Sequence, residues 1–276
     1  MKRLFRFLYR LLPFKKQFFL FLKLFWDPTE RVFMHLHFKG PFRASIRGEG
    51  SFILFHGGNH IENSIFWKGL PGGFEKESMR LWIELCKESS VIFDLGANSG
   101  VYSLVAKAVN PQARVFAFEP HPVFFSLLEK NKTLNGFDLN IHKVAVSDAD
   151  GKITVPDFSQ VQKGFEVDSV RLDTFISTQG IEKLDIIKID VESFEPYVLK
   201  GFENYLPRFR PAFLIEVLND EIGKIIEQRT AGLNYLYFSI DEAEGVKRVS
   251  SILKGTGLNY LLCDLKTAHR LELPMD

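Results

Sequence analysis

Carboxylates stand at the ends of several apolar runs in the middle of this sequence of 276 residues. Asp94 lies near the end of "VIFDL", Glu119 closes "RVFAFE", and Asp190 and Glu192 follow "LDIIKI". A carboxylate can attract a cation, accept two hydrogen bonds from a vicinal diol, or take the proton of a hydroxyl. These acids therefore predict a site for a ligand with cationic and hydroxyl groups.

The stretch "DLGANSG", residues 94–100, is a glycine-rich turn between an apolar run and a helix start. Gly96 allows a sharp turn, and Gly100 lets the helix begin close to a ligand. No Gly-Lys-Ser/Thr follows, so the turn is not a P-loop. Asn98 replaces the second glycine of a dinucleotide site, and Asp94 would repel a pyrophosphate but favour an ammonium or sulfonium group.

Glu119 follows Gly100 by nineteen residues and is the acid expected to bind both hydroxyls of an adenosine ribose. A cationic group joined to an adenosine points to S-adenosylmethionine. The alternative is that Asp94 and Glu119 are merely solvated strand ends. We favour the cofactor, because open α/β sheets bind their ligands at the carboxyl ends of neighbouring strands.

Strands and helices alternate in the segments that would position these acids. The order βαβαβ, with continuous apolar strands, indicates an α/β fold in which a parallel sheet has helices on both faces. The predicted strands are 91–95, 114–119, 139–146, 184–190 and 211–218, and the predicted helices are 77–89, 100–109, 122–136, 173–180, 196–206 and 221–230.

Two further pairs of apolar segments predict antiparallel strands. Segments 152–155 and 165–172 follow a turn sequence and are expected to form an added hairpin outside the main sheet. The connection between 234–240 and 258–265 is too short for a full crossover helix, so an antiparallel final pair is expected. The main sheet is then expected to have seven strands.

Composition sets broad limits on function. The net charge of +1 gives no global case for nucleic-acid binding, and we expect no nucleic-acid partner. Two cysteines, Cys86 and Cys263, are too few for a disulfide framework and indicate a reducing cytoplasm.

The first 26 residues carry seven Lys or Arg, no acid, and many Phe and Leu. No charge-free run is long enough to span a bilayer, and no small-residue cleavage site follows, so neither a spanning helix nor a signal peptide is expected. Two interpretations stay open: peripheral membrane contact at the inner face of the membrane, or an arm that packs Phe5, Leu8, Leu12 and Phe19 on its own domain.

The stretch from residue 40 to about 73 alternates short apolar runs with Gly and Pro, which indicates short strands and turns. We therefore divide the chain into residues 1–75, a basic amphipathic arm with a small β-rich cap, and residues 76–276, the cofactor-binding domain. His56 and His60 in the cap are interpreted as surface or hydrogen-bonding residues and not as ligands.

The motifs "FDLGANSGVYSL", "FAFEPHPVFFSLLEKNKTLN", "VAVSDADG", "VRLDTFI", "LDIIKIDVESFEPYVLKG" and "RPAFLIEV" resemble, in order and in wording, the FkbM family of S-adenosylmethionine-dependent methyltransferases. The resemblance covers about residues 75–218. It implies a class I methyltransferase (Rossmann-like) fold, with a seven-stranded, mostly parallel sheet whose last strand is antiparallel, and O-methylation of sugar or natural-product hydroxyls. One departure is Ser193, which stands where the family has the glycine of Asp-Val-Glu-Gly.

The resemblance also implies roles for individual residues. The methionine end of the cofactor would be lined by the glycine turn, the ribose by the acid and proline after the second strand, and the adenine by backbone near residue 146. The residues of the glycine turn are Asp94, Gly96, Ala97, Asn98 and Gly100. Those at the ribose are Glu119 and Pro120, and those at the adenine are Ala145 and Val146.

The acceptor is expected beside the end of the fourth strand, where Lys188, Asp190 and Glu192 are the catalytic candidates. Asp190 or Glu192 would take the hydroxyl proton. Glu195, Glu216 and His121 are the candidates for substrate contact, although Glu195 is equally well explained as a carboxylate at a helix start. A divalent cation at these acids is an alternative, but their spacing does not favour it, and we expect no tightly held metal.

The sequence thus predicts a cytoplasmic S-adenosylmethionine-dependent O-methyltransferase that acts on a sugar or glycan precursor. Two alternatives remain: methylation of a polyketide or peptide natural product, and a non-catalytic module that binds a nucleoside.

Overall fold

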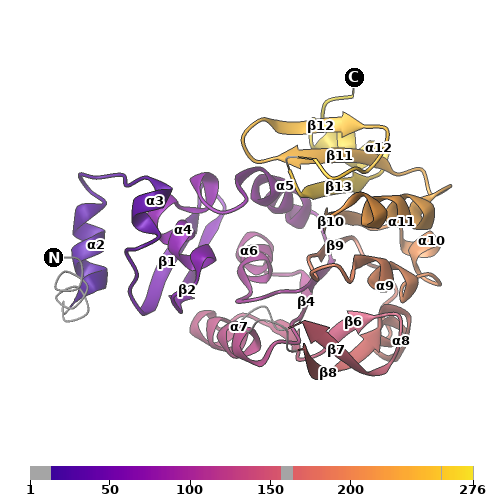
Figure 1. Cartoon of the computed structure of the whole chain (residues 1–276), viewed down its shortest axis with the longest axis horizontal. Coiled ribbons are helices and arrows are strands. Elements are labelled where there is room, and N and C mark those ends of the chain that lie inside the picture. The colour runs from indigo at the N-terminus through magenta and orange to yellow at the C-terminus, as the bar shows by residue number, and fades with distance from the viewer. Residues whose placement is uncertain (1–13, 157–163, 256, 276) are drawn as a thin grey trace.

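The computed structural model describes residues 14–156, 164–255 and 257–275 (Figure 1). Its main sheet has eight strands in the order β12-β11-β13-β10-β9-β3-β4-β5, and strands β5, β4, β3, β9 and β10 run parallel. The strands are β3 (Val91–Leu95), β4 (Arg114–Phe118), β5 (Leu139–His142), β9 (Ile186–Ile189), β10 (Ala212–Glu216), β11 (Leu236–Asp241), β12 (Gly245–Val249) and β13 (Asn259–Cys263). The mostly parallel α/β fold is confirmed.

The C-terminal strands are antiparallel, as expected. The sheet has eight strands and not the predicted seven, because the C-terminal part contributes one strand more than the sequence indicated. Strand β13 pairs with both β10 and β11, and the extra strand β12 pairs with β11 at the sheet edge. The Asp241 carboxylate accepts hydrogen bonds from the backbone of Ala243 and Glu244, and Gly245 has a φ of 95°. This tight turn sends the chain straight back as β12, inside a segment that the sequence suggested was partly loop.

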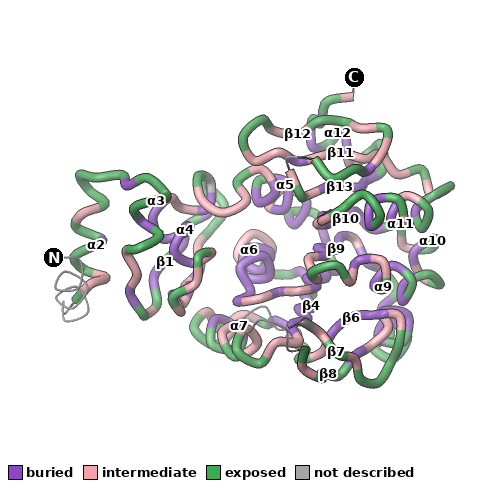
Figure 2. Tube along the Cα trace, viewed as in Figure 1, coloured by how far each residue is buried: buried purple, intermediate pink, exposed green. Residues whose placement is uncertain are grey.

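Among the described residues, buried apolar side chains cover the sheet in two large clusters and a small one of Ala97, Ala117 and Leu128. Figure 2 shows the buried stretches of the strands that form this sheet. Because successive strand residues point to opposite faces, Ile92 belongs to one core and Phe93 to the other. The first core includes α5 (Lys76–Lys87) and α6 (Val101–Val109), whereas the second includes α8 (Leu172–Thr178), α9 (Glu195–Lys200), α10 (Leu206–Phe209) and α11 (Asp220–Thr230). Helices α7 (Pro122–Asn135) and α12 (Leu265–Arg270) complete the domain.

A separate three-stranded sheet has the order β6-β8-β7. The predicted strand 139–146 is split: β5 ends at His142, and β6 (Ala145–Ser147) joins this small sheet. The predicted hairpin is confirmed as β7 (Gly151–Pro156) and β8 (Gly164–Arg171), which pair antiparallel outside the main sheet.

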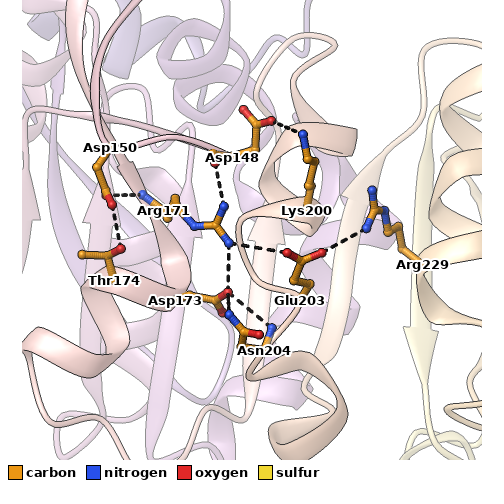
Figure 3. Close-up of polar contacts among 9 residues, drawn as sticks. All are labelled: Asp148, Asp150, Arg171, Asp173, Thr174, Lys200, Glu203, Asn204 and Arg229. Carbon is orange, nitrogen blue, oxygen red and sulfur yellow. Dashed lines mark hydrogen bonds and ion pairs between the residues drawn. The ribbon is translucent and has the colours of Figure 1, made fainter.

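Polar contacts fix the small sheet to the helices beside it (Figure 3). The Arg171 guanidinium donates to the Asp148 carbonyl at 2.8 Å and pairs with Asp173 at 3.3 Å and with Glu203 at 3.6 Å. Lys200 pairs with the Asp148 carboxylate at 2.7 Å. The small sheet is therefore held in one position relative to α8 and α9.

The N-terminal part contains a hairpin of β1 (Gly40–Ile46) and β2 (Gly50–His56), as the alternation of short apolar runs with Gly and Pro indicated. It also contains a nine-residue helix, α4 (His60–Lys68), which the prediction of strands and turns missed; this helix buries Ile65, Phe66 and Trp67. The remaining helices are α2 (Lys15–Leu22), α3 (Glu30–Phe33) and the short η1 (Leu70–Gly72).

Side chains of α7 dock the hairpin onto the main domain. The side-chain oxygen of Asn131 accepts a hydrogen bond from the Phe55 backbone, and that of Asn135 accepts one from the Ile53 backbone. Core residues Phe52 and Leu54 of β2 share their apolar cluster with residues of α6. The boundary at residue 75 stays a prediction.

The two cap histidines are hydrogen-bonding residues. The buried His56 ring contacts the Asn63 side chain at 3.0 Å, and burial lowers the pKa of His56 to about 4. His60 contacts Glu30 at 3.0 Å.

Of the arm residues, Phe19 is buried and its ring lies 5.4 Å from that of Trp67, whereas Phe5, Leu8 and Leu12 lie outside the described residues. No helix in the described ranges is long and apolar enough to cross a bilayer.

Candidate active site

A cavity of about 350 Å³ lies at the carboxyl ends of β3, β4, β9 and β10. It brings together twelve of the residues that the sequence singled out, from five segments of the chain. They are Gly96, Ala97, Asn98, Glu119, Pro120, His121, Ala145, Val146, Lys188, Asp190, Glu192 and Glu216. Three other candidates, Asp94, Gly100 and Glu195, do not line the cavity.

The glycine turn is held against the second strand. The backbone N–H groups of Gly96 and Ala97 both donate to the Phe118 carbonyl at 3.0 Å. Gly96 has a φ of 76° and Asn98 a φ of 52°, so both lie in the left-handed region that glycine and asparagine tolerate best. Gly100 has a φ of 88°, and a β-carbon there would lie 2.5 Å from a terminal methyl group of Leu128 of α7, which would have to move.

Two backbone N–H groups hold the carboxylate of Glu119. Its Oε2 accepts from the Asn98 backbone N–H at 2.8 Å, and its Oε1 accepts from the His121 backbone N–H at 2.8 Å. Each oxygen keeps further capacity to accept, which suits a vicinal diol. Burial raises the pKa of Glu119 to about 7, against these two hydrogen bonds.

Asp94 lies beneath the cavity and not in its wall. It is fully buried, its Oδ2 accepts from the Ser103 hydroxyl at 2.6 Å, and its Oδ1 has no hydrogen-bond partner among the described residues. Burial raises the pKa of Asp94, although the nearby Lys188 opposes this. Lys188, which does line the cavity, is the register partner of Asp94 on β9.

Lys188 is the buried cation of the site. Its ammonium lies 2.7 Å from Asp190 and 4.5 Å from the centre of the Tyr102 ring. Burial opposes its charge, but Asp190, Asp94 and Glu75 outweigh burial and hold the pKa of Lys188 above its ordinary value. Lys188 therefore stays protonated and fixes the Asp190 carboxylate at the cavity edge.

Two further acids face this edge. Burial and the charges of Asp190 and Glu192 raise the pKa of Glu216 to about 8. Partial burial and the Asp190 charge also raise the pKa of Glu192. Glu192 has a φ of 54° and Ser193 a φ of 77°, so the turn after Asp190 takes the left-handed form at the position where the family has glycine.

Glu195 serves the turn itself. It is buried, and its Oε1 accepts from the backbone N–H groups of Val191 and Ser193, both at 3.3 Å. Burial raises the pKa of Glu195 to about 7. This geometry agrees with its interpretation as a carboxylate at the start of α9.

The cavity also contains residues that the sequence analysis did not select. They are mostly aromatic or apolar, and one is an acid: Ile61, Phe74, Glu75, Ser99, Val101, Tyr102, Phe124, Val155, Phe165, Val191 and Phe194. Phe165 of β8 meets the His121 ring edge-on at 5.1 Å, so the small sheet reaches the ribose side of the cavity. Only Glu75, an acid just before a predicted helix, carried a chemical signal in the sequence.

The donor set fits S-adenosylmethionine. The carboxylate of Glu119 is oriented so that it can accept hydrogen bonds from a diol. Lys188 is surrounded by the acids Asp190, Asp94 and Glu75, and this excess of acidic groups suits a cationic ligand. Within the described ranges, no three His, Cys, Asp or Glu side chains are grouped so that they could hold a metal ion.

The family model for the methyltransferase FkbM domain matches residues 94–237, just over half of the chain. The chain is similar to the hexuronic acid methyltransferase AglP of Haloferax volcanii, with 27% identity over 48% of this chain and 58% of that protein. It is also similar to the 31-O-demethyl-FK506 methyltransferase FkbM of Streptomyces tacrolimicus, with 29% identity over 54% of this chain and 73% of that protein.

Among solved structures, a methyltransferase FkbM from Methylobacillus flagellatus has a TM-score of 0.44 and 20% identity, over 63% of this chain and 43% of that one. The matched regions span less than two thirds of AglP and less than half of the Methylobacillus flagellatus protein.

Proposed function

Because this chain belongs to the FkbM family of methyltransferases, we propose that it moves a methyl group from S-adenosylmethionine to a hydroxyl of a sugar or glycan precursor. The observation that carries this proposal is the pairing of two features in one cavity. Glu119, whose carboxylate two backbone N–H groups orient as a diol acceptor, lines the same cavity as the acids Asp190, Glu192 and Glu216.

When bound, S-adenosylmethionine supplies a methyl group that is already activated on a cationic sulfur. The residues that would hold it are Glu119 at the ribose hydroxyls, the turn from Gly96 to Asn98 at the methionine end, and Ala145 and Val146 at the adenine. The remaining task of the protein is to position the acceptor hydroxyl and to take its proton.

Asp190 is the base that the contacts favour, with Glu192 as the alternative. Lys188 holds the Asp190 carboxylate at 2.7 Å, which fixes its direction at the cavity edge. Glu216 has its pKa raised to about 8, so it would be protonated at neutral pH and could donate a hydrogen bond to the acceptor. Glu195 supports the turn that carries Asp190 and Glu192.

The acceptor class rests on chemistry and on the names of the relatives. AglP is named for a hexuronic acid and NoeI of Sinorhizobium fredii as a 2-O-methyltransferase, whereas FkbM is named for FK506. A sugar hydroxyl is weakly acidic and needs a base, which the acidic edge supplies. Methylation of a polyketide or peptide product is the alternative acceptor class, and a non-catalytic nucleoside-binding module is the alternative without chemistry.

We also propose that the enzyme is cytoplasmic and that residues 1–26 make peripheral contact with the inner face of the membrane. Seven large apolar side chains between Phe14 and Trp26 are exposed, among them Phe21 and Phe25 at 59% and 78%. All seven charges within residues 1–26 are positive. Exposed aromatic side chains beside Lys and Arg suit an anionic lipid surface, which would bring the enzyme to membrane-borne glycans.

Transfer of labelled methyl groups from S-adenosylmethionine to a panel of glycans, lipid-linked sugars and hydroxylated natural products tests the proposal. We expect label in a sugar, and strongly reduced label with Asp190→Asn or Glu192→Gln. Label only in a natural product would favour the alternative acceptor, and full activity of both variants would exclude our choice of base.

A further inference from the structure

We propose that Glu75 binds the ammonium group at the amino-acid end of S-adenosylmethionine. This inference rests on the proposed function, because it assumes the same cofactor. Glu75 lies outside residues 94–237, which the family model matches, and it immediately precedes α5. It is therefore a contribution of this chain's N-terminal part to the cavity.

The Glu75 side chain is directed into the cavity by specific contacts. It lines the cavity, and its Oε2 accepts from the Tyr102 hydroxyl at 2.5 Å. Tyr102 in turn lies under the Lys188 ammonium, 4.5 Å from the ring centre. Glu75 thus approaches Lys188 from the Tyr102 side, while Asp190 contacts the same ammonium directly.

The backbone of Glu75 is held in a conformation that a free chain would avoid. Its φ of 47° and ψ of 55° lie in the left-handed region, which costs a residue other than glycine free energy. The first turn of α5 is anchored by Glu242, whose carboxylate accepts from the backbone of Glu77 at 2.6 Å and from the Ser78 hydroxyl at 2.7 Å. The surrounding structure therefore maintains Glu75 where it faces the cavity.

The charge balance around Lys188 calls for additional positive charge. One ammonium is shared by three carboxylates, those of Asp190, Asp94 and Glu75, which leaves an excess of negative charge when all are ionised. Burial raises the pKa of Glu75, and Lys188 only partly opposes this. A ligand that brings its own cations would pair with these acids.

S-adenosylmethionine has two positive groups, the sulfonium and the amino-acid ammonium. The sulfonium must face the acceptor hydroxyl, so it belongs near Asp190, where the proposed base lies. The ammonium is the second positive group, and Glu75 is a further acid of the cavity wall, which reaches the Lys188 environment through Tyr102 and not through the direct contact that Asp190 makes. Its carboxylate would form a charge-assisted hydrogen bond, which is stronger than a neutral one.

Isothermal titration calorimetry with three ligands distinguishes a contact of Glu75 with the ammonium from a contact with the sulfonium and from a purely structural role. S-adenosylmethionine has both cations, S-adenosylhomocysteine has only the ammonium, and 5′-methylthioadenosine has neither. We expect Glu75→Gln to weaken binding of the first two ligands by a similar factor, roughly tenfold or more, and to leave 5′-methylthioadenosine unchanged. Glu77→Gln, at an acid that pairs with Arg80 and does not line the cavity, should change none of the three.

Each other pattern overturns the inference. A loss for S-adenosylmethionine alone would assign Glu75 to the sulfonium, an equal loss for all three ligands would make its role structural, and no loss would remove it from the site. If Glu75→Gln does not fold, Glu75→Asp keeps the charge but shortens its reach, and the same selective pattern is expected. A wild-type chain that binds none of the ligands would instead contradict the proposed function.

Discussion

A β-carbon at Gly96 would lie 1.8 Å from the carbonyl oxygen of Asp190, so the glycine turn and the acidic turn after β9 are packed backbone against backbone. The turn that would hold the cofactor and the residue that would act as base are thereby set in one rigid arrangement. A change at Gly96 must displace Asp190, or the turn, or both.

Gly96→Ala is therefore expected to destabilise the chain by about 3 kcal/mol or more and to abolish cofactor binding. Gly48→Ala is the matched control, because Gly48 has a similar φ of 78° but nothing within 4 Å of the added carbon. It should cost only about 1–2 kcal/mol, the strain of the left-handed region. Denaturant unfolding measures both; equal losses would show that the contact with Asp190 is unimportant.

Ser193→Gly should stabilise the chain. Ser193 has a φ of 77°, its side chain is exposed, and its backbone N–H donates to Glu195. Glycine adopts this conformation without a steric penalty, so we expect a gain of about 1 kcal/mol in the free energy of unfolding. Thermal and denaturant unfolding of the variant test this, and a loss of stability would mean that the serine side chain makes a contact that outweighs the strain.

The sequence predicted the parts of the site that follow from local rules. The glycine turn, Glu119 and the acids after β9 lie at the carboxyl ends of strands, where the parallel topology requires them to meet. It did not select Glu75, because the acid itself is visible in the sequence but its place beside the strand ends is not: the adjoining first turn of α5 is anchored by Glu242 from the distant β11–β12 turn. Asp94 was expected to line the methionine end of the site, but strand β3 buries it beside Lys188 and it does not line the cavity.

Cofactor affinity should rise with pH through the range where Glu119 ionises. Burial raises its pKa from 4.5 to about 7 in the folded chain, and an ionised carboxylate is the better acceptor for a diol. We expect about a tenfold gain in affinity for S-adenosylmethionine between about pH 6 and about pH 8, and a shallower dependence for Glu119→Gln. An unchanged slope in the variant would assign the dependence to other groups.

Because of Glu119, the free energy of unfolding of the ligand-free chain should fall with rising pH, whereas the cofactor affinity should rise. Because the folded state holds the Glu119 proton more tightly than the unfolded state does, stability falls as pH rises from about 4.5 to about 7. Glu119→Gln should reduce this fall, which thermal unfolding at several pH values would measure.

Membrane contact should depend on the exposed aromatic face of α2 and the residues after it. The rings of Phe21 and Phe25 lie 5.4 Å apart, and both are exposed. Replacing both with serine should strongly reduce flotation with vesicles that contain anionic phospholipid, since each buried Phe contributes about 2 kcal/mol. Serine at Val123 and Leu265, exposed apolar residues elsewhere, is the control. Equal flotation of both double variants, or none for the wild type, would contradict membrane contact through this face.

The most direct test of the central claim is calorimetric titration of the full chain with S-adenosylmethionine, repeated with Glu119→Ala. The carboxylate of Glu119 is held by two backbone N–H groups at 2.8 Å, which set the direction of its two oxygens. We predict saturable binding to the wild type and a loss of at least about tenfold in the variant, because two hydrogen bonds to a charged group are removed. No binding to the wild type, or equal binding to both proteins, would contradict the account.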